Sequence, residues 1–305
     1  MAGYLHEDRA LMLDAINHVV ELRGLDPVII EKDYYVSLLL MKISAINPDL
    51  VFKGGTSLSK CYGLIDRFSE DIDIAFFGKA TGTVKGEVMD GILKSIEEVG
   101  LTLTNPEAIK HRQKLNHYRI SYVPVASCAN PSVKGGEIEV ETSYFFESEP
   151  VKILEVHSYL GDFIAEEAES FLEMYEGLKA FPMKVQSLER TLVDKVFAIC
   201  DYYLDGKCKR KSRHLYDIHK LLSEVQIDDA FKYLVLRIRS ARAKDPGRCP
   251  SAQPGVDIPE LINRIIAEEA YLEDWENITE GLIYEHVSYD EVIESLRRLN
   301  TLEMF

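Results

Sequence analysis

Two aspartates, Asp71 and Asp73, stand one residue apart at the start of DIDIAFF, a run whose apolar residues predict a buried strand. Alternate side chains of a strand point to the same face, so both carboxylates would share one face while Ile72 and Ile74 pack on the other. Carboxylates this close repel each other unless a cation compensates them. Mg²⁺ accepts one or two carboxylates together with waters and phosphate oxygens. The spacing therefore favours a metal site, and a turn or strand-start cap without metal is the alternative.

A pair of glycines, Gly54 and Gly55, precedes the aspartates, between the expected strand LVFK and a short helix that begins near Thr56 and Ser57. Glycine lets backbone N–H groups approach a ligand closely, and the start of a helix favours negative charge. The stretch therefore predicts a cradle for phosphate, although it is neither a GxxxxGK[ST] loop nor a GxGxxG fingerprint. A tight strand-to-helix turn without a ligand is the alternative. Together, the glycines and the aspartates predict a site for a nucleoside triphosphate.

The composition indicates an ordinary folded chain of 305 residues, of which 46% are hydrophobic and 28% charged. No run approaches the roughly 18 consecutive apolar residues that a membrane span needs, and the N-terminus lacks the basic start and apolar run of an export signal. The five cysteines are scattered without a CxxC pair, which favours reduced thiols over disulfides or a zinc site. We therefore expect a cytoplasmic protein with no membrane partner.

The formal net charge of −16 argues against a protein that coats nucleic acid non-specifically, because the overall field repels phosphates. One basic stretch, GKCKRKSRH, departs from this balance. Its cations are Lys207, Lys209, Arg210, Lys211 and Arg213. The stretch is either a solvated loop or a local contact for the phosphates of a nucleic acid.

The elements that would position these residues change in character along the chain. Helical periodicity over the first part is followed by alternating strands, among them HYRISYVPVA and GEIEVETSYFF. From about residue 166 onward the periodic segments are helical, and the last one opens with a Ser288–Glu291 capping box. The pattern predicts an α+β fold in which a small mixed sheet flanked by helices, residues 1–165, precedes an all-helical C-terminal domain, residues 166–305.

The stretch KGGTSLSKCYGLIDRFSEDIDI resembles the GG/S–DxD signature of the nucleotidyltransferase superfamily, and more narrowly it is similar to the AbiEii/AbiGii toxin family. Three other segments resemble that family in the same order: IEKDYYV its N-terminal helix, LVDKVFAI its lysine-bearing helix and RHLYDIHKL its aspartate-bearing helix. The similarity covers the chain from the first of these segments to the last. It implies that the sheet of residues 1–165 is nucleotidyltransferase-like.

The resemblance also implies roles for the acidic residues. Asp71 and Asp73 would be catalytic metal ligands in a two-metal nucleotidyl transfer. The family has a third carboxylate on a neighbouring strand, and GEIEVET offers Glu139 and Glu141, which share a face. Glu139, with an apolar residue on either side, fits the family pattern and is preferred as the third catalytic and metal-binding acid. Glu141 is the alternative third acid. If neither has a function, both acids simply face solvent on an ordinary strand.

Two residues of the C-terminal half complete the expected site. Lys195 lies in an apolar helical stretch, where an unpaired ammonium costs free energy, and the resemblance implies that it binds the β- and γ-phosphates. Asp217 matches the family's aspartate and would hold Lys195 or orient the base, or else serve structure alone. Gly54, Gly55, Thr56 and Ser57 would bind the nucleotide. We expect Arg67 and Ser69 to fix the loop ahead of the aspartates.

The function implied is a Mg²⁺- or Mn²⁺-dependent transfer of a nucleoside monophosphate from a nucleoside triphosphate to an acceptor, with the tRNA 3′ end preferred. The protein would be the toxin of a toxin–antitoxin or abortive-infection system, with a cognate antitoxin as partner. The basic stretch would then contact RNA phosphates. The alternatives are transfer to a protein hydroxyl or a small molecule, and a degenerate module that binds nucleotides without catalysis.

Overall fold

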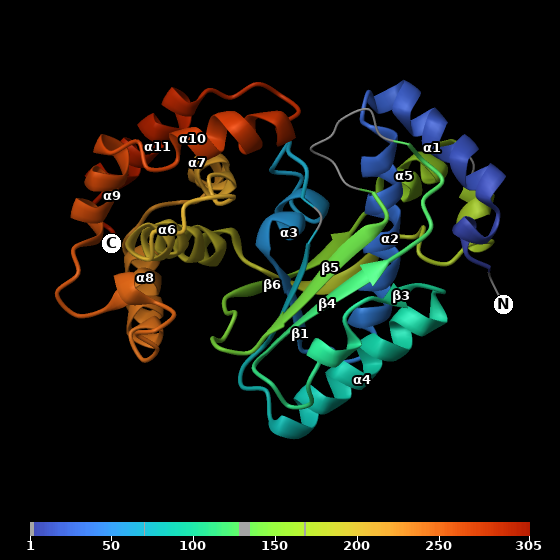
Figure 1. Ribbon diagram of the computed structural model, residues 1–305, viewed down its shortest axis with the longest axis horizontal. Coiled ribbons are helices and arrows are strands. Elements are labelled where there is room, and N and C mark those ends of the chain that lie inside the picture. Colours follow the sequence, from blue (N-terminus) through green and yellow to red (C-terminus); the bar gives the residue numbers. More distant parts are fainter. Residues whose placement is uncertain (1–2, 70, 128–134, 168) are drawn as a thin grey trace. The chain divides into compact units, whose positions relative to one another are not determined.

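The computed structural model describes residues 3–69, 71–127, 135–167 and 169–305, and it consists of two compact units (Figure 1). Unit 1 comprises Met1–Gly63 and Ser69–Gln186, and unit 2 comprises Leu64–Phe68 and Ser187–Phe305. The expected boundary after residue 165 lies inside unit 1, because the chain returns to the sheet as one more strand before the main part of unit 2 begins.

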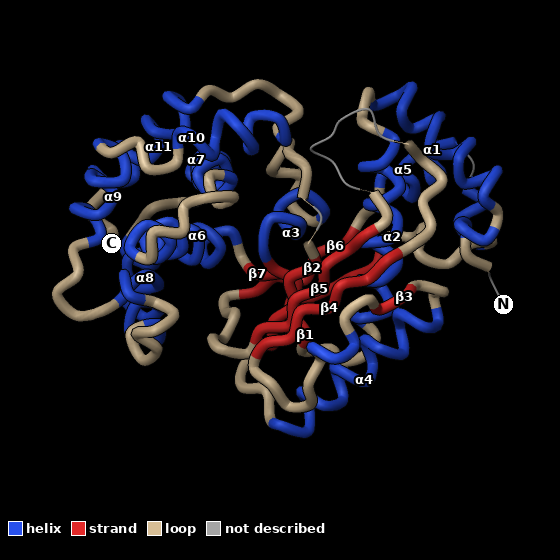
Figure 2. Tube along the Cα trace, in the orientation of Figure 1, coloured by secondary structure: helices blue, strands red, loops and turns tan. Residues whose placement is uncertain are grey.

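Unit 1 is built on a mixed sheet, drawn in red in Figure 2. Within the described residues, seven strands pair in the order β3-β4-β5-β2-β1-β7-β6. Their bounds are β1 Leu50–Lys53, β2 Ile72–Phe76, β3 Thr102–Leu103, β4 Leu115–Ser121, β5 Glu137–Ser143, β6 Val151–Val156 and β7 Phe181–Gln186. β2 pairs with β5 and β1 with β7 in parallel, while the other neighbours are antiparallel. The expected α+β class with a small mixed sheet is confirmed.

The helices of unit 1 begin and end at recognisable sequence signals. Gly24, in a left-handed conformation, ends α1, and Asp26 caps α2 by accepting the N–H of Val28. The bounds are α1 Arg9–Arg23, α2 Pro27–Ser44, α3 Gly54–Lys60, α4 Gly82–Glu98 and α5 Tyr159–Glu167, with the short turns η1 Leu5–Glu7, η2 Pro106–Ala108 and η3 Glu169–Glu173. α3 follows β1 without an intervening loop, so the glycine pair itself forms the first turn of this helix.

The two faces of the sheet differ in chemistry. Ile72, Ile74 and Val140 are fully buried in a core that they share with α2 and α4. Because side chains alternate along a strand, Asp73 on β2 and Glu141 on β5 project from the opposite face. One face therefore packs the sheet, while the other presents carboxylates.

Lys60, at the end of α3, fixes this helix in unit 1. Its ammonium donates to Asp33 Oδ1 at 2.5 Å, to Ser37 Oγ at 2.6 Å and to the carbonyl of His157 at 3.0 Å. The second oxygen of Asp33 accepts the N–H of Tyr159 at 2.9 Å. This buried network ties α3 to α2 and to the start of α5, so the glycine turn is held from both ends.

Unit 2 is built from helices. Its elements are α6 Leu188–Leu204, α7 Arg213–Glu224, α8 Asp229–Arg242, η4 Pro250–Ala252, α9 Ile258–Ala267, α10 Leu272–Asp274, η5 Trp275–Thr279, η6 Glu280–Leu282 and α11 Tyr289–Thr301. Ser187 caps α6, and the expected capping box of Ser288 with Glu291 opens α11. The predicted start of the last helix is therefore confirmed.

Two further expectations concern membranes and thiols. Within the described ranges, no helix combines the length and the apolar character needed to cross a bilayer. Cys61, Cys200, Cys208 and Cys249 are free thiols. Cys128 lies outside the described residues.

His214 of α7 is held as a neutral ring. It stacks on Tyr202 with ring centroids 5.7 Å apart, and its Nδ1 is shielded from water without a hydrogen-bond partner in the described part of the chain. Burial, and then the nearby cations Lys195 and Arg213, lower the pKa of His214 well below its ordinary value. The folded protein therefore excludes a proton that the unfolded chain accepts in mild acid.

We predict that this ring makes the protein acid-sensitive. The unfolded chain binds a proton at His214 below about pH 6.5 and the folded chain does not, so the free energy of unfolding falls by about 1.4 kcal/mol between about pH 7.5 and 5.5. Unfolding of the wild type and of His214→Phe, which keeps the stack on Tyr202, should be measured at both pH values. The variant should lose less stability in acid, and an equal loss in both proteins would contradict the prediction.

Candidate active site

A row of charged side chains crosses four neighbouring strands of unit 1. In the antiparallel pair of β1 and β2, Lys53 lies opposite Asp73. In the parallel pair of β2 and β5, Asp73 lies beside Glu141, and β4 places His117 beside Glu141 in turn. Partners in adjacent strands project from the same face, so the side chains of Lys53, Asp73, Glu141 and His117 stand in one line, here called the charged row.

Gly54 is required where the glycine turn meets this row. Its φ of +81° is a left-handed conformation that other residues adopt only with strain. A Cβ at this position would overlap the carboxylate of Asp73, because that carboxylate packs directly against the glycine. The structure thus brings Asp73 against the glycine turn, two features that the sequence singled out separately.

The two hydroxyls after the glycines are buried in the turn itself. Ser57 Oγ donates to the carbonyl of Gly54 at 2.8 Å, and Thr56 Oγ1 lies 2.9 Å from Ser69 Oγ. Ser57 is fully buried and Thr56 is 1% exposed. Their side chains therefore hold the turn against the loop that leads to the aspartates, and the groups of this turn that remain suited to a ligand are main-chain N–H groups.

Glu141 stands beside Asp73 in the pairing of β2 with β5. Burial raises the pKa of Glu141, and the negative charges of Asp73 and Asp71 raise it further. Glu139 lies two residues away, with a side chain 54% exposed and a carboxylate 3.3 Å from Arg119 Nε. The register therefore favours Glu141 over the Glu139 preferred from the flanking pattern.

The carboxylates of the charged row fit an open cation site. Within the described residues, no group of three or more His, Cys, Asp or Glu side chains is arranged to hold a metal ion by itself. Mg²⁺ needs fewer protein ligands, since waters and substrate oxygens complete its shell. Asp73 and Glu141 supply two adjacent carboxylates whose repulsion a cation would relieve. The residues present therefore fit a cation that shares its coordination with a phosphate.

Lys195 and Asp217, both expected from the family motifs, meet in unit 2. Lys195 Nζ lies 2.5 Å from Asp217 Oδ2, and the same carboxylate accepts two hydrogen bonds from Arg67. Burial alone would raise the pKa of Asp217, but Arg67 and Lys195 together hold it well below its usual range. Asp217 therefore stays ionised, and the contact of Lys195 with phosphates remains a prediction.

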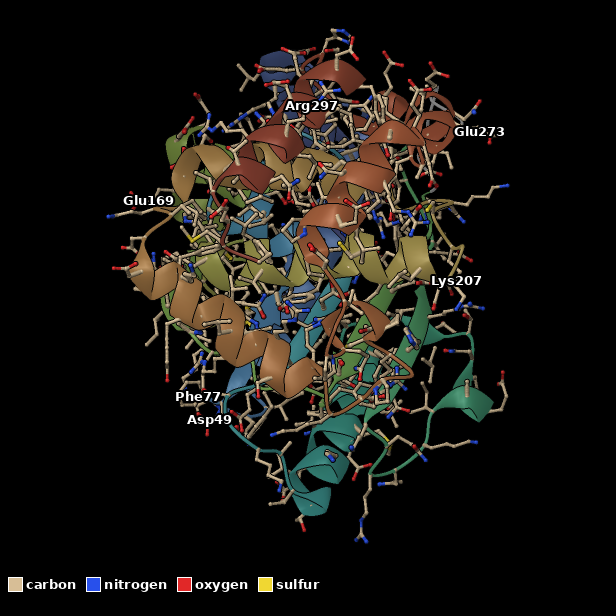
Figure 3. All side chains as sticks on the ribbon, turned by 90° about the vertical axis from the view of Figure 1, so that its left-hand side faces the viewer. Asp49, Phe77, Glu169, Lys207, Glu273 and Arg297 are labelled. Atoms are coloured by element: carbon tan, nitrogen blue, oxygen red, sulfur yellow. The ribbon has the colours of Figure 1, made fainter. Side chains whose placement is uncertain are left out.

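The basic stretch Lys207–Arg213 leads into α7 and is shaped by Asp274. The carboxylate of Asp274 accepts the N–H groups of Arg210, Lys211 and Ser212, and it also accepts the hydroxyl of Ser212 at 2.7 Å. Lys207, labelled in Figure 3, has a side chain 69% exposed and lies 2.8 Å from Asp205. The sequence did not point to Asp274, because it lies 62 positions further along the chain than Ser212 and no motif marks it.

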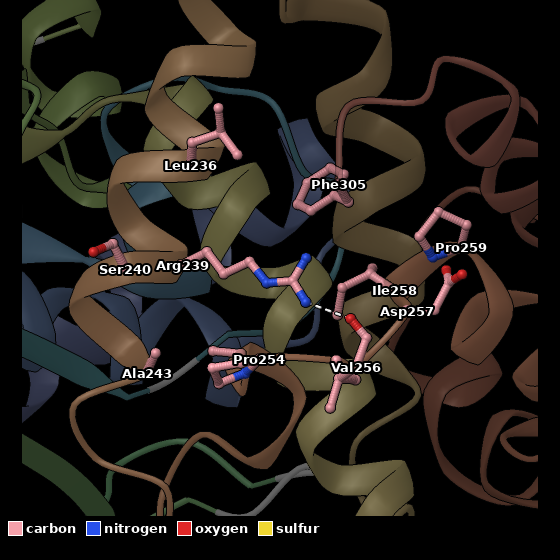
Figure 4. Close-up of a pocket in the computed structure, with 12 residues that line it drawn as sticks. Leu236, Arg239, Ser240, Ala243, Pro254, Val256, Asp257, Ile258, Pro259 and Phe305 are labelled. Carbon is pink, nitrogen blue, oxygen red and sulfur yellow. Dashed lines mark hydrogen bonds between the residues drawn. The ribbon is translucent and has the colours of Figure 1, made fainter.

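A pocket of about 820 Å³ lies elsewhere in unit 2, between α8 and the loop that precedes α9 (Figure 4). Its lining is largely apolar, with Leu236, Val256 and Phe305 among its residues. Arg239 crosses it and donates to the carbonyl of Val256. None of the residues predicted for the active site lines this pocket, so it does not compete with the charged row as the candidate site.

Known proteins resemble this chain in sequence pattern and in fold. A family model described as the nucleotidyl transferase AbiEii toxin of a type IV toxin–antitoxin system matches residues 38–295. Among solved structures, the chain is similar to MenT4, a nucleotidyltransferase toxin from Mycobacterium tuberculosis H37Rv. That comparison has a TM-score of 0.61 and 18% sequence identity, and it covers 96% of this chain and 88% of the other; it shows a shared fold. No curated protein sequence matches the chain.

We predict that Gly54→Ala disrupts the site although every charged residue stays in place. The new methyl group would meet the Asp73 carboxylate and the left-handed backbone adds strain, so the free energy of unfolding should fall by about 2–4 kcal/mol. Mn²⁺ binding, titrated by calorimetry, should weaken as well.

Gly63→Ala is the matched control for this substitution. Gly63 also has a positive φ, +59°, but a Cβ there meets only open space. Strain alone should cost about 1–2 kcal/mol and leave Mn²⁺ binding unchanged. Equal effects of the two substitutions would show that the packing against Asp73 does not constrain position 54.

Proposed function

The chain belongs to the AbiEii nucleotidyltransferase toxin family, and from this membership we propose that it transfers a nucleoside monophosphate from a nucleoside triphosphate to the 3′ end of tRNA. It would act as the toxin of a toxin–antitoxin or phage-defence system, with a cognate antitoxin protein as its partner. The observation that carries the proposal is the charged row packed against Gly54, which joins paired carboxylates to a glycine turn.

Asp71, Asp73 and Glu141 are the proposed ligands for Mg²⁺ or Mn²⁺, although the described residues do not arrange these three as a complete metal site. A divalent cation bound there would activate the acceptor hydroxyl and neutralise charge on the triphosphate. The β2–β5 register supports this set over one with Glu139, since it sets Asp73 and Glu141 side by side. Asp71 is near enough for its charge to raise the pKa of Glu141, which supports its inclusion.

The triphosphate would lie along the glycine turn. The proposed donors are the main-chain N–H groups at Gly54, Gly55 and Thr56, together with the ammonium of Lys53 in the charged row. Ser57 would act by supporting the turn through its bond to Gly54. Lys195 stays the proposed cation for the β- and γ-phosphates, with Asp217 as its counter-charge.

The basic stretch Lys207–Arg213 is the proposed contact for the RNA backbone. Asp274 holds this loop through main-chain N–H groups, while Lys207 pairs with Asp205 and Lys211 lies over the ring of Tyr202. A loop ordered in advance loses less conformational entropy when it binds. A local basic loop would also allow an acidic chain to approach RNA at one place and be repelled elsewhere.

We predict that the purified chain, given radiolabelled nucleoside triphosphates, Mg²⁺ and total tRNA, labels the RNA at its 3′ end. Glu141→Gln should lower the initial rate at least about 100-fold, because a cation-binding carboxylate contributes several kcal/mol to the transition state. Glu139→Gln is the matched control, and its rate should stay within about threefold of wild type because exposed ion pairs contribute little. Denaturing gels of the labelled RNA give the rates.

Other outcomes of the same assay separate the alternatives. If Glu139→Gln loses the activity and Glu141→Gln keeps it, Glu139 is the third metal ligand. Label on protein or on a small molecule, with none on RNA, would refute the tRNA acceptor. Nucleotide binding without transfer of label would identify a non-catalytic module.

We predict that the basic stretch sets the salt dependence of RNA binding. Replacing Lys207, Lys209 and Lys211 with alanine should weaken tRNA binding, and the slope of log K against log salt should fall by about one for each phosphate that the loop no longer neutralises. Alanine at Lys94, Lys232 and Lys244 removes the same charge elsewhere on the surface and should leave the slope unchanged. Filter binding over a salt series measures both, and equal slopes in the two triple variants would refute the proposed role of the basic stretch.

A further inference from the structure

The segment Leu64–Phe68, here called the anchor segment, lies between α3 and β2 in the sequence but belongs to unit 2. Main-chain hydrogen bonds of 2.9 and 2.8 Å join it to Leu282 and Tyr284. Between these bonds, Arg67 forms an antiparallel β-bridge with Ile283. The anchor segment is thus joined to the helical unit by a single β-bridge and its flanking main-chain hydrogen bonds.

Arg67 ties the anchor segment to the interior of unit 2. Its Nε and Nη2 donate to the two oxygens of Asp217 at 2.7 and 2.8 Å, while Nη1 donates to the carbonyl of Phe68 at 2.9 Å. The side chains of Arg67 and Asp217 are 2% and 0% exposed. A planar guanidinium bonded on both edges accepts one orientation only, so it holds the main chain of the anchor segment as well as its own side chain.

Two residues of α7 hold Asp66 in the same segment. Lys220 Nζ lies 2.9 Å from Asp66 Oδ2, and the N–H of Asp66 donates to the hydroxyl of Tyr216 at 3.1 Å. The Lys220–Asp66 pair is partly exposed, with side chains 23% and 45% accessible. The anchor segment is therefore held by a buried pair and by a second pair that can be changed with little risk to folding.

We propose that Arg67 is a positioning residue for the nucleotidyl transfer. Through Asp217 it fixes the anchor segment, and through the anchor segment it fixes the chain that enters the aspartate pair. Only two residues separate Phe68 from Asp71, and the three steps of chain between their Cα atoms span at most about 11 Å. The inference rests on the proposed function for the role of Asp71, whereas the contacts of Arg67 stand independently of it.

The energetics of the buried pair support a role in positioning. Burying an arginine and an aspartate costs desolvation free energy that their attraction only partly offsets, so apolar residues of similar size would give comparable stability. The contribution of the ion pair is therefore to position rather than to stability, because its fixed geometry specifies where the main chain of the anchor segment lies. Asp217 receives Lys195 on the same carboxylate, so the expected phosphate-binding lysine and the anchor segment share one counter-charge.

The test compares Arg67→Lys with Arg242→Lys. Arg67→Lys keeps the buried positive charge but loses the two-pronged bond to Asp217. Arg242 also bonds two carboxylates in unit 2, the half-buried Asp194 and the buried Asp201, so its substitution is a matched control. Amide hydrogen exchange of peptides covering residues 64–73 and steady-state kinetics of label transfer are measured on each full-length protein.

Arg67→Lys should speed exchange in residues 64–73 by about tenfold or more and lower kcat by about 100-fold, with KM for the nucleotide within about threefold of wild type. Arg242→Lys should leave both readouts near wild type. A wild-type kcat in Arg67→Lys, or a raised KM with kcat unchanged, would overturn the proposal, the second because Arg67 would then touch the substrate.

A second variant keeps the proposal testable if Arg67→Lys does not fold. Lys220→Met removes the outer, partly exposed pair and should lower kcat by about threefold to fivefold with KM unchanged, together with faster exchange in residues 64–73. Wild-type exchange and kcat in Lys220→Met would then overturn it. If the wild type transfers no label at all, the proposed function fails, while the exchange readout still decides whether Arg67 holds the anchor segment.

Discussion

The parallel pairing of β2 with β5 is the constraint on which the chemistry of unit 1 depends, because main-chain hydrogen bonds hold Asp73 beside Glu141 whatever their charges do. Two carboxylates so placed repel each other, and partial burial limits how far water can screen them. The neighbouring strands temper the repulsion by adding Lys53 on one side and His117 on the other. The opposite face of the same strands is apolar and fully buried, so its packing stabilises an arrangement that the acids alone would not adopt.

The sequence predicted the features that depend on residues close together in the chain, and it did not predict those that depend on contacts between distant segments. The burial of Ile72 and Ile74 on one face of β2, with Asp73 on the other, depends on a period of two within one strand, which is a local rule and can be predicted from the sequence. The choice between Glu139 and Glu141 depends on the register between strands far apart in the chain, and both acids lie in the same alternating pattern. The role of Asp274 could not be predicted for the same reason, because only folding brings its carboxylate to the main chain of Lys211.

In unit 2, buried carboxylates hold main-chain N–H groups and the side chains of arginine and lysine residues in place. Asp217 receives Arg67 and Lys195, Asp201 receives Arg242 and the N–H of Ser251, and Asp274 receives a run of main-chain N–H groups. Each acid has charged or N–H partners, as buried charge requires. The helical periodicity that predicted these helices located the apolar contacts between them, but it carries no information on which acid meets which donor.

The chain passes from one unit to the other after Gly63, after Phe68 and after Gln186. A gene fragment that stops at codon 186 would therefore encode the whole sheet together with five residues whose packing partners are missing, among them an arginine that needs a buried acid. Recombination between relatives meets the same obstacle, because an exchanged helical half must bring its own version of Leu64–Phe68 from the middle of the other half. The two halves are thus inherited as one piece, although each has a core of its own.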